Sequence, residues 1–142
     1  DVTTALIKNC KVIKQYEIFN HILRDKSDFY LICPDSGATK KIFELAKLVN
    51  TAGVVECTKQ RNTATGEIVQ TIVHADDLAG KDCYIVDDIC DGGRTFTEIA
   101  KVLKAKNCGK VALLVTHGFF TKGLGVFDGL IDEIYTRKGK IK

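Results

Sequence analysis

Residues 84–97 read YIVDDICDGGRTFT, and this stretch decides the fold class. An apolar strand meets two adjacent carboxylates, passes through two glycines and continues into a helix. Open sheets of parallel strands bind ligands at the carboxyl ends of their strands, so at least one of Asp87 and Asp88 can face such a crevice. Because carboxylates suit sugar hydroxyls, the stretch predicts an α/β sheet with a site for a phosphorylated sugar.

The second half of the stretch suits a phosphate group. Gly92 and Gly93 let the backbone pass close to an anion without a Cβ atom in the way. The NH groups that open the helix near Arg94 and Thr95 favour a negative charge. An ordinary strand-turn-helix connection explains any one of these residues, but the whole string, Asp91 included, exceeds what capping requires. Neither GxxxxGK[ST] nor GxGxxG is present, which argues against a P-loop and a dinucleotide fold.

Apolar runs bounded by turns alternate with helical periodicity along the rest of the chain. This alternation predicts a mostly parallel sheet flanked by helices, in one domain that spans 1–142. The patterns predict strands near 10–13, 29–33, 53–57, 67–73, 82–87, 110–116 and 131–135, and helices at 15–24, 38–49 and 94–106. The loops that follow the strands therefore gather on one rim of the sheet, except for 58–66.

Composition agrees with one compact cytoplasmic domain. The chain has 142 residues, is 45% hydrophobic and carries a formal charge of +3 at pH 7, so it is long enough for a sizeable core. The mild charge neither demands nor excludes nucleic acid, and we expect no nucleic-acid partner. No apolar run approaches the roughly 20 residues that cross a bilayer, and the N-terminus has no signal-peptide layout.

The six cysteines show no metal-ligand spacing such as CxxC. Four of them, Cys33, Cys57, Cys83 and Cys108, lie in or beside apolar runs, which predicts free and mostly buried thiols. Cys90 is the exception, because its place in the proposed phosphate loop allows exposure. Oxidation or alkylation of an exposed Cys90 would block ligand binding.

Two further segments carry groups that suit phosphates. CPDSGATKK at 33–41 puts a Pro and a Gly between a strand and a helix. Its backbone NH groups at Ser36, Gly37 and Ala38, with Lys40 and Lys41 beside them, form a plausible pyrophosphate or triphosphate cradle. A capped turn with solvated lysines explains the same letters. Separately, TKQRNTATG at 58–66 is polar and predicts an exposed hairpin loop that is mobile without substrate.

Four stretches in the same order resemble the type I phosphoribosyltransferase fold, and the form with Asp91 is most similar to phosphoribosyl pyrophosphate synthetases (ribose-phosphate diphosphokinases). Residues 84–97 resemble the ribose 5-phosphate loop and CPDSGATKK the pyrophosphate loop. TKQR at 58–61 resembles the flexible catalytic loop, and VTHGFF at 115–120 a late strand end whose His117 can contact a ligand or subunit.

The resemblance implies roles for individual residues. Lys59 falls on the catalytic lysine and Arg61 on an arginine that binds phosphates. Asp35 falls on a contributor to a Mg²⁺ site, a fitting role for a hard oxygen ligand. The implied substrate-binding set comprises Asp87, Asp88, Asp91, Gly92, Gly93, Arg94 and Thr95, and the implied pyrophosphate loop comprises Asp35, Ser36, Gly37 and Ala38.

The resemblance also implies an activity. With ATP and Mg²⁺, the intact protein would transfer a pyrophosphoryl group to ribose 5-phosphate and form phosphoribosyl pyrophosphate, as a homo-oligomer. The chain has no Met and begins DVTTALI, so we expect the C-terminal half of a longer protein, inactive alone. Two alternatives stay open. One is a small phosphoribosyltransferase that uses phosphoribosyl pyrophosphate. The other is a non-catalytic regulatory or assembly subunit, which Arg94 and Gln60 favour because they depart from the family pattern.

Overall fold

A mostly parallel sheet forms the centre of the fold. The computed structural model describes residues 14–142, and these form a seven-stranded sheet in the order β3-β2-β1-β4-β5-β6-β7. The strands are β1 (Ser27–Cys33), β2 (Asn50–Arg61), β3 (Ile68–Val73), β4 (Cys83–Cys90), β5 (Val111–Gly118), β6 (Glu133–Thr136) and β7 (Gly139–Lys140). Neighbouring strands from β2 to β6 are parallel, whereas β3 and β7 pair antiparallel at the two edges. The predicted α/β class is confirmed.

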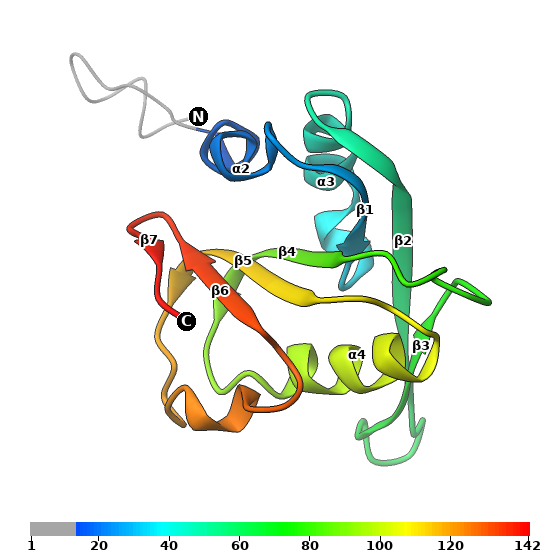
Figure 1. The fold of residues 1–142 in the computed structure, drawn as a ribbon. Helices are drawn as coiled ribbons and strands as arrows, with labels where there is room; N and C mark the ends of the chain where they lie inside the picture. Colours follow the sequence, from blue (N-terminus) through cyan, green and yellow to red (C-terminus); the bar gives the residue numbers. More distant parts are fainter. Residues whose placement is uncertain (1–13) are drawn as a thin grey trace, which may run out of the picture.

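Helices cover both faces of this sheet (Figure 1). Helices α2 (Gln15–Leu23) and α3 (Thr39–Ala46) lie on one face, and α4 (Arg94–Ala105) lies on the other. Two short 3-10 helices, η1 (Ser36–Ala38) and η2 (Gly125–Phe127), complete the described part of the chain. None of the helices in this part has the length and apolarity to cross a membrane.

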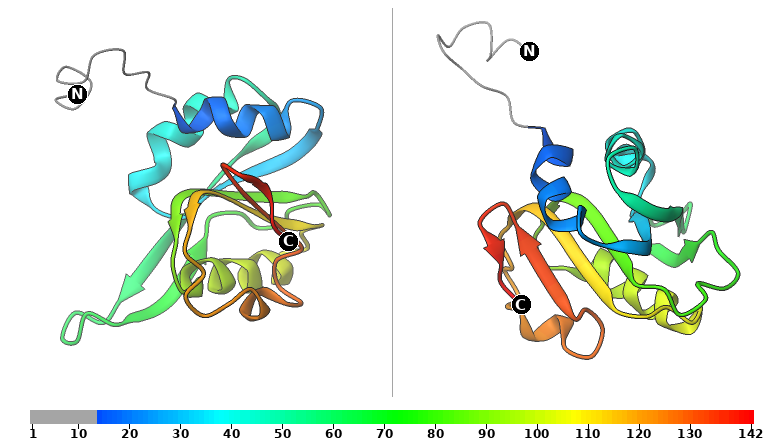
Figure 2. Two further views of the ribbon diagram at one scale, coloured as in Figure 1. Left: turned by 90° about the vertical axis from the view of Figure 1, so that its left-hand side faces the viewer. Right: turned by 45° about the horizontal axis from the view of Figure 1, so that its top comes forward.

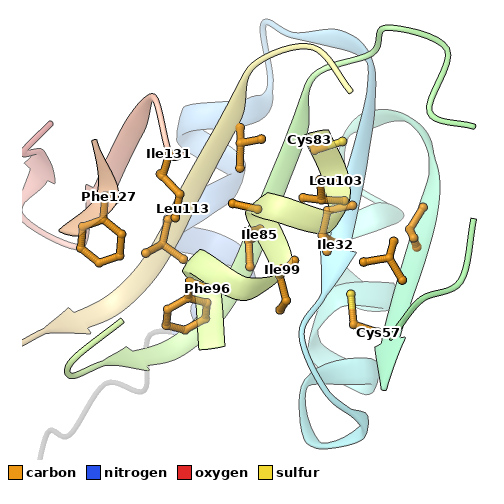
Figure 3. Close-up of a cluster of buried hydrophobic side chains, with 14 of the residues drawn as sticks. Ile32, Cys57, Cys83, Ile85, Phe96, Ile99, Leu103, Leu113, Phe127 and Ile131 are labelled. Carbon is orange, nitrogen blue, oxygen red and sulfur yellow. The ribbon is translucent and has the colours of Figure 1, made fainter. Parts of the chain in front are cut away.

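The larger core cluster lies between α4 and the sheet (Figure 3). Phe96, Ile99 and Leu103 follow the spacing of one helical face and are buried there, as expected for an amphipathic helix that covers a sheet. They pack in one cluster with Ile85 of β4 and Leu113 of β5. This packing fixes the start of α4, and with it the loop that precedes the helix.

The opposite face has its own apolar cluster. Phe19 of α2 and Ile42 of α3 are fully buried there with Leu31 of β1, and Phe29 stacks edge-on against Tyr84 with ring centroids 5.1 Å apart. Each central strand therefore alternates its side chains between two apolar layers, because successive residues of a strand point to opposite faces.

The two central strands lead to helices on opposite faces. β1 continues through η1 into α3, and its neighbour β4 continues into α4. Between two such strands the connections diverge, which leaves a crevice at their carboxyl ends. The loops at 34–38 and 91–93 therefore meet at this point.

Several predicted boundaries were wrong. β4 runs on to Cys90 rather than ending at residue 87, because it keeps pairing with β5 as far as Gly118. β2 covers 50–61 rather than 53–57, so residues 58–61 of the predicted loop are strand and pair with β3. The helix predicted at 38–49 is shorter and follows a 3-10 turn, and β7 and η2 were not predicted. The strand predicted at 10–13 lies outside the described residues.

Candidate functional site

A cavity of about 350 Å³ opens where β1 and β4 end. Three segments that lie far apart in the sequence contribute to it: the end of β1, the end of β2, and the turn from β4 into α4. The lining residues are Asp35, Lys59, Asp87, Ile89, Asp91, Gly92, Gly93, Arg94, Thr95 and Phe96. The cavity thus combines three carboxylates and two cations with the start of a helix.

The side chains of the two adjacent acids of β4 lie on opposite faces of the sheet. Asp87 lines the cavity, whereas the carboxylate of Asp88 accepts a 2.5 Å hydrogen bond from Lys41 Nζ of α3. Strand alternation explains this division, since consecutive side chains point to opposite sides. Asp88 was predicted to bind the ribose, yet it does not line the cavity in this structure.

Burial is the main electrostatic influence on Asp87. Desolvation raises the pKa of its carboxyl group, and the negative charges of Asp35 and Asp88 raise it further. The NH of Asp88, which donates to Asp87 Oδ1 over 2.8 Å, and the ammonium of Lys59 act in the opposite direction. Keeping this carboxylate ionised costs free energy because it is partly desolvated and near other negative charges. Such carboxylates are typical of binding sites, where a ligand or cation offsets that cost.

The two glycines of the loop have different structural roles. Gly93 has φ +88°, and a Cβ atom there would lie 2.5 Å from the ring of Phe127, so both the backbone conformation and the packing require glycine. Gly92 has no positive φ, and its added Cβ would meet only the flexible side chain of Lys122 at 3.6 Å. Neither the backbone conformation nor the packing therefore requires glycine at position 92.

Helix α4 begins at the cavity without a side-chain cap. Its first intrahelical hydrogen bond runs from Thr97 N to Gly93 O, which leaves the NH groups of Arg94, Thr95 and Phe96 without a helical acceptor. These donors and the positive end of the helix dipole suit an anion such as phosphate. This arrangement agrees with the predicted phosphate loop.

Lys59 reaches the same helix start from β2. Its Nζ donates a hydrogen bond to Thr95 Oγ1 over 3.2 Å, and the half-buried side chain lines the cavity. The register of β2 against β3 pairs Lys59 with Thr71, so the hairpin holds the lysine over the first turn of α4. The cation is therefore positioned to contact phosphate oxygens.

Arg61 lies outside the cavity in this structure. Its guanidinium donates to Gly66 O over 3.2 Å, a contact within the β2–β3 hairpin. The turn of the hairpin is closed by Asn62, whose Oδ1 accepts from the NH groups of Ala64 and Thr65. Figure 2 shows the hairpin projecting beyond the body of the fold. A contact between Arg61 and the cavity would require its hydrogen bond to Gly66 O to break.

The loop after β1 is a capped turn in this structure. Asp35 Oδ1 accepts a hydrogen bond from Ala38 N over 3.2 Å and caps η1. The NH of Ala38 is therefore not free for an anion, contrary to the sequence-based expectation. Asp35 also lines the cavity, but Ser36, Gly37 and Ala38 do not. An anion that used the NH of Ala38 would displace the Asp35 cap.

Arg94 stands between this cavity and a second hollow of about 430 Å³. Lys59, Arg94 and Thr95 line both of them, and the second hollow lies between β3 and α4. Within residues 14–142 the Arg94 side chain forms no hydrogen bond or ion pair. An exposed guanidinium in this place is available to an anionic ligand on either side.

Two apolar side chains of the cavity were not predicted from the sequence. Ile89 is 53% exposed despite its position in a central strand, and Phe96 lines the cavity while 96% buried in the core, with 4% of its surface exposed. Ile89 lies two residues beyond Asp87, so strand alternation alone places both on one face. That signal was available once the strand was extended past residue 87.

Cys90, whose place in the proposed phosphate loop allowed exposure, is instead buried. Its side chain is fully buried in the core cluster that contains Phe127, and desolvation, with Asp91 and Asp87 nearby, raises the pKa of its thiol to about 11. Cys33, Cys57, Cys83 and Cys108 are free, as predicted, and Cys108 is the half-buried member of this group.

Residues 7–125 match the phosphoribosyl transferase domain family. The chain belongs to this family. Its similarity extends to curated ribose-phosphate pyrophosphokinases, with 27% identity over 122 residues to that of Mycoplasmopsis pulmonis and 33% over 102 residues to that of Cereibacter sphaeroides. These alignments cover 84% and 72% of the chain but only 38% and 30% of the relatives. The chain therefore spans less than two-fifths of their length.

Solved structures agree on the type I phosphoribosyltransferase fold. Adenine phosphoribosyltransferase from Thermoanaerobacter pseudethanolicus matches with a TM-score of 0.64 and 18% identity, over 86% of this chain and 76% of that one. Phosphoribosylpyrophosphate synthetase from Mycobacterium smegmatis matches with a TM-score of 0.56 and 20% identity, over 83% of this chain and 36% of that one. The resemblance drawn from the four sequence motifs is thus confirmed at the level of family and fold.

Proposed function

We propose that this chain is the ribose 5-phosphate-binding, C-terminal part of a ribose-phosphate diphosphokinase. In the intact protein, the anomeric hydroxyl oxygen of ribose 5-phosphate attacks the β-phosphorus of ATP. The bond from that phosphorus to the α-phosphate oxygen breaks, and AMP leaves. The hydroxyl proton passes to solvent or a base, and the product is phosphoribosyl pyrophosphate.

The observation that carries this proposal is the convergence of three motifs on one cavity. Asp35 follows β1, and Lys59 and Asp87 lie in β2 and β4. All three line the same space as residues 91–95. A phosphate at the start of α4 would accept hydrogen bonds from the helix NH groups and from Thr95. Asp87, four to eight residues upstream of that loop, would then accept hydrogen bonds from ribose hydroxyls.

The carboxylates of the cavity fit a Mg²⁺ ion. Mg²⁺ is commonly bound by one or two carboxylates together with substrate phosphates and water. Asp35 and Asp87 line the same cavity and lie close enough for the charge of Asp35 to raise the pKa of Asp87. When bound there, Mg²⁺ would neutralise charge on the pyrophosphate that is transferred. Asp35 would give up its cap on η1 or share that oxygen.

Lys59 is the residue of this chain best placed to act on the transition state. Phosphoryl-type transfer relies on positioning and on cations that meet the developing negative charge. Lys59 Nζ already lies at the helix start, 3.2 Å from Thr95 Oγ1. Arg61 would join it after the hairpin moves, because its present partner is Gly66 O.

Two other functions remain candidates. A phosphoribosyltransferase that acts on a base shares the fold, as the match to adenine phosphoribosyltransferase indicates. A non-catalytic subunit would keep the sugar phosphate site without transfer, and Arg94 is the feature that favours it. The sequence similarity to ribose-phosphate pyrophosphokinases favours the diphosphokinase over both.

A direct test compares this 142-residue chain with the full-length protein from the same gene. Each is incubated with ATP, ribose 5-phosphate and Mg²⁺, and phosphoribosyl pyrophosphate and AMP are measured. We expect product only from the full-length protein. Synthesis by the short chain would refute the division into two parts. A full-length protein that binds ribose 5-phosphate but makes no product would favour the regulatory subunit.

A further inference from the structure

A third hollow lies at the same rim of the sheet, outside the cavity described above. It has a volume of about 210 Å³ and is lined by Thr116, His117, Gly118, Phe119, Thr136, Arg137 and Lys138. These residues come from the end of β5 and from the turn between β6 and β7. None of them is acidic, and none lines the sugar phosphate cavity.

The hollow exists because β5 and β6 separate. Their last parallel pair is Leu114 with Tyr135, after which β6 turns into β7 at Thr136. β5 continues beside β4 as far as Gly118. The fork between the two parallel strands leaves a crevice at their carboxyl ends.

In the part of the chain that the structure describes, the two cations of the hollow differ from their neighbours in having no ion-pair partner. Lys140 pairs with Glu133 at 3.5 Å, and Lys142 pairs with Asp128 at 2.7 Å. The side chains of Arg137 and Lys138 form no ion pair or hydrogen bond within residues 14–142. Two adjacent positive charges without a carboxylate partner favour an anion in the hollow.

A buried hydroxyl completes the donor set. Thr136 is only 8% exposed, and its Oγ1 accepts a hydrogen bond from Lys138 N over 3.2 Å. The hydrogen of this hydroxyl has no acceptor among the described residues, so it remains available for a ligand in the hollow. An oxyanion in the hollow would accept a hydrogen bond from this hydroxyl.

We propose that the fork between β5 and β6 is a second anion site, which binds a phosphate group through Arg137, Lys138 and the hydroxyl of Thr136. A phosphate group is the fitting ligand class, because arginine and hydroxyl donors together match its several acceptor oxygens. The ligand is inorganic phosphate or the phosphate group of a small ester. If the ester carries a ring, the ring can pack against Phe119, which lines the hollow and is 67% exposed.

The test uses the ¹⁵N-labelled chain and nuclear magnetic resonance at constant ionic strength. Inorganic phosphate should shift the amide signals of 116–119 and 136–138 along a saturable curve. Arg137→Gln should raise the Kd of this curve by about five- to tenfold, since it removes a charge-assisted hydrogen bond. Lys140→Gln is the matched control, because it removes the same charge from the same hairpin without lining the hollow, and it should leave the Kd within about twofold.

Two further comparisons distinguish free phosphate from a phosphate ester, and this hollow from the sugar phosphate cavity. Saturation by phosphate alone assigns the site to the free anion, whereas saturation only by AMP assigns it to a phosphate ester. Thr95→Ala, in the sugar phosphate cavity, should leave this response unchanged. No saturable shift with phosphate or AMP up to about 20 mM, a weak limit for specific binding, would overturn the proposal. An equal loss in Lys140→Gln and Arg137→Gln would also overturn it, as it would indicate general charge attraction.

Discussion

Lys59 Nζ of β2 and Thr95 Oγ1 of α4 are joined by a 3.2 Å hydrogen bond across the candidate site. The bond links two elements that the proposed reaction uses differently, because α4 holds the sugar phosphate while β2 supplies the cation for transfer. Lys59 is thus held over the cavity. A phosphate at the start of α4 would accept from both side chains.

Lys59→Ala in the full-length protein should lower kcat far more than it weakens binding of ribose 5-phosphate. The reason is that its charge acts chiefly on the transition state. Steady-state kinetics and calorimetry measure the two quantities. Lys101→Ala is the control, because Lys101 pairs with Glu98 at 3.1 Å on α4 and lines neither the cavity nor the adjoining hollow. Equal effects on kcat and on binding would remove Lys59 from the chemical step.

Gly93→Ala should destabilise the chain by about 2–4 kcal/mol, because a left-handed φ and a clash with Phe127 add together. Gly92→Ala should change the free energy of unfolding by less than about 1 kcal/mol, since its Cβ meets only a flexible lysine. It should nevertheless weaken ribose 5-phosphate binding. Urea unfolding and calorimetry test the pair. Similar stability of both variants would contradict the distinct roles of the two glycines.

Asp87→Asn should stabilise the ligand-free chain at pH 7. The pKa of Asp87 is raised in the folded state, so its ionised form destabilises the fold. This penalty is absent below the unfolded value of about 3.9, grows as the pH rises through the raised folded pKa, and is constant above it. The gain in melting temperature over wild type should therefore disappear towards pH 3. Asp25→Asn, at an exposed position, should show no such gain.

Cys90 should react slowly with iodoacetamide at pH 8 in the folded chain. Its thiol is fully buried and its pKa is raised to about 11, so little thiolate is accessible. Among the five described cysteines, Cys108 should be labelled first, because it is the half-buried one. Peptide mass spectrometry over time gives the order. Rapid labelling of Cys90 would indicate that the loop opens far enough to expose the core.

The sequence was sufficient to predict the fold class and the order of the loops, because hydrophobic periodicity and glycine placement are local signals. Contacts between segments that are distant in the sequence were harder to predict. Nothing near Asp88 indicates that its partner is Lys41, since the ion pair depends on the packing of α3 against the sheet. The burial of Cys90 likewise depends on continued pairing of β4 with β5 and on Phe127.

The extent of β2 shows a second limit of prediction from the sequence. Polar residues at 58–61 predicted a loop, but the antiparallel partner β3 supplies the backbone hydrogen bonds that make them strand. Side-chain polarity reports exposure to water, and an exposed hairpin is polar whether or not it is paired. Lys59 reaches the cavity because this segment is a strand of fixed register.

Titration calorimetry of this chain with ribose 5-phosphate in the presence of Mg²⁺ tests the central claim most directly. We expect saturable binding that Asp87→Asn and Thr95→Ala each weaken by about 1–3 kcal/mol, since each removes a hydrogen bond to a charged or polar ligand group. Thr97→Ala, next to the site on α4 but outside the cavity, should bind as wild type does. Affinity that is unchanged in both site variants would place the sugar phosphate elsewhere and contradict the account.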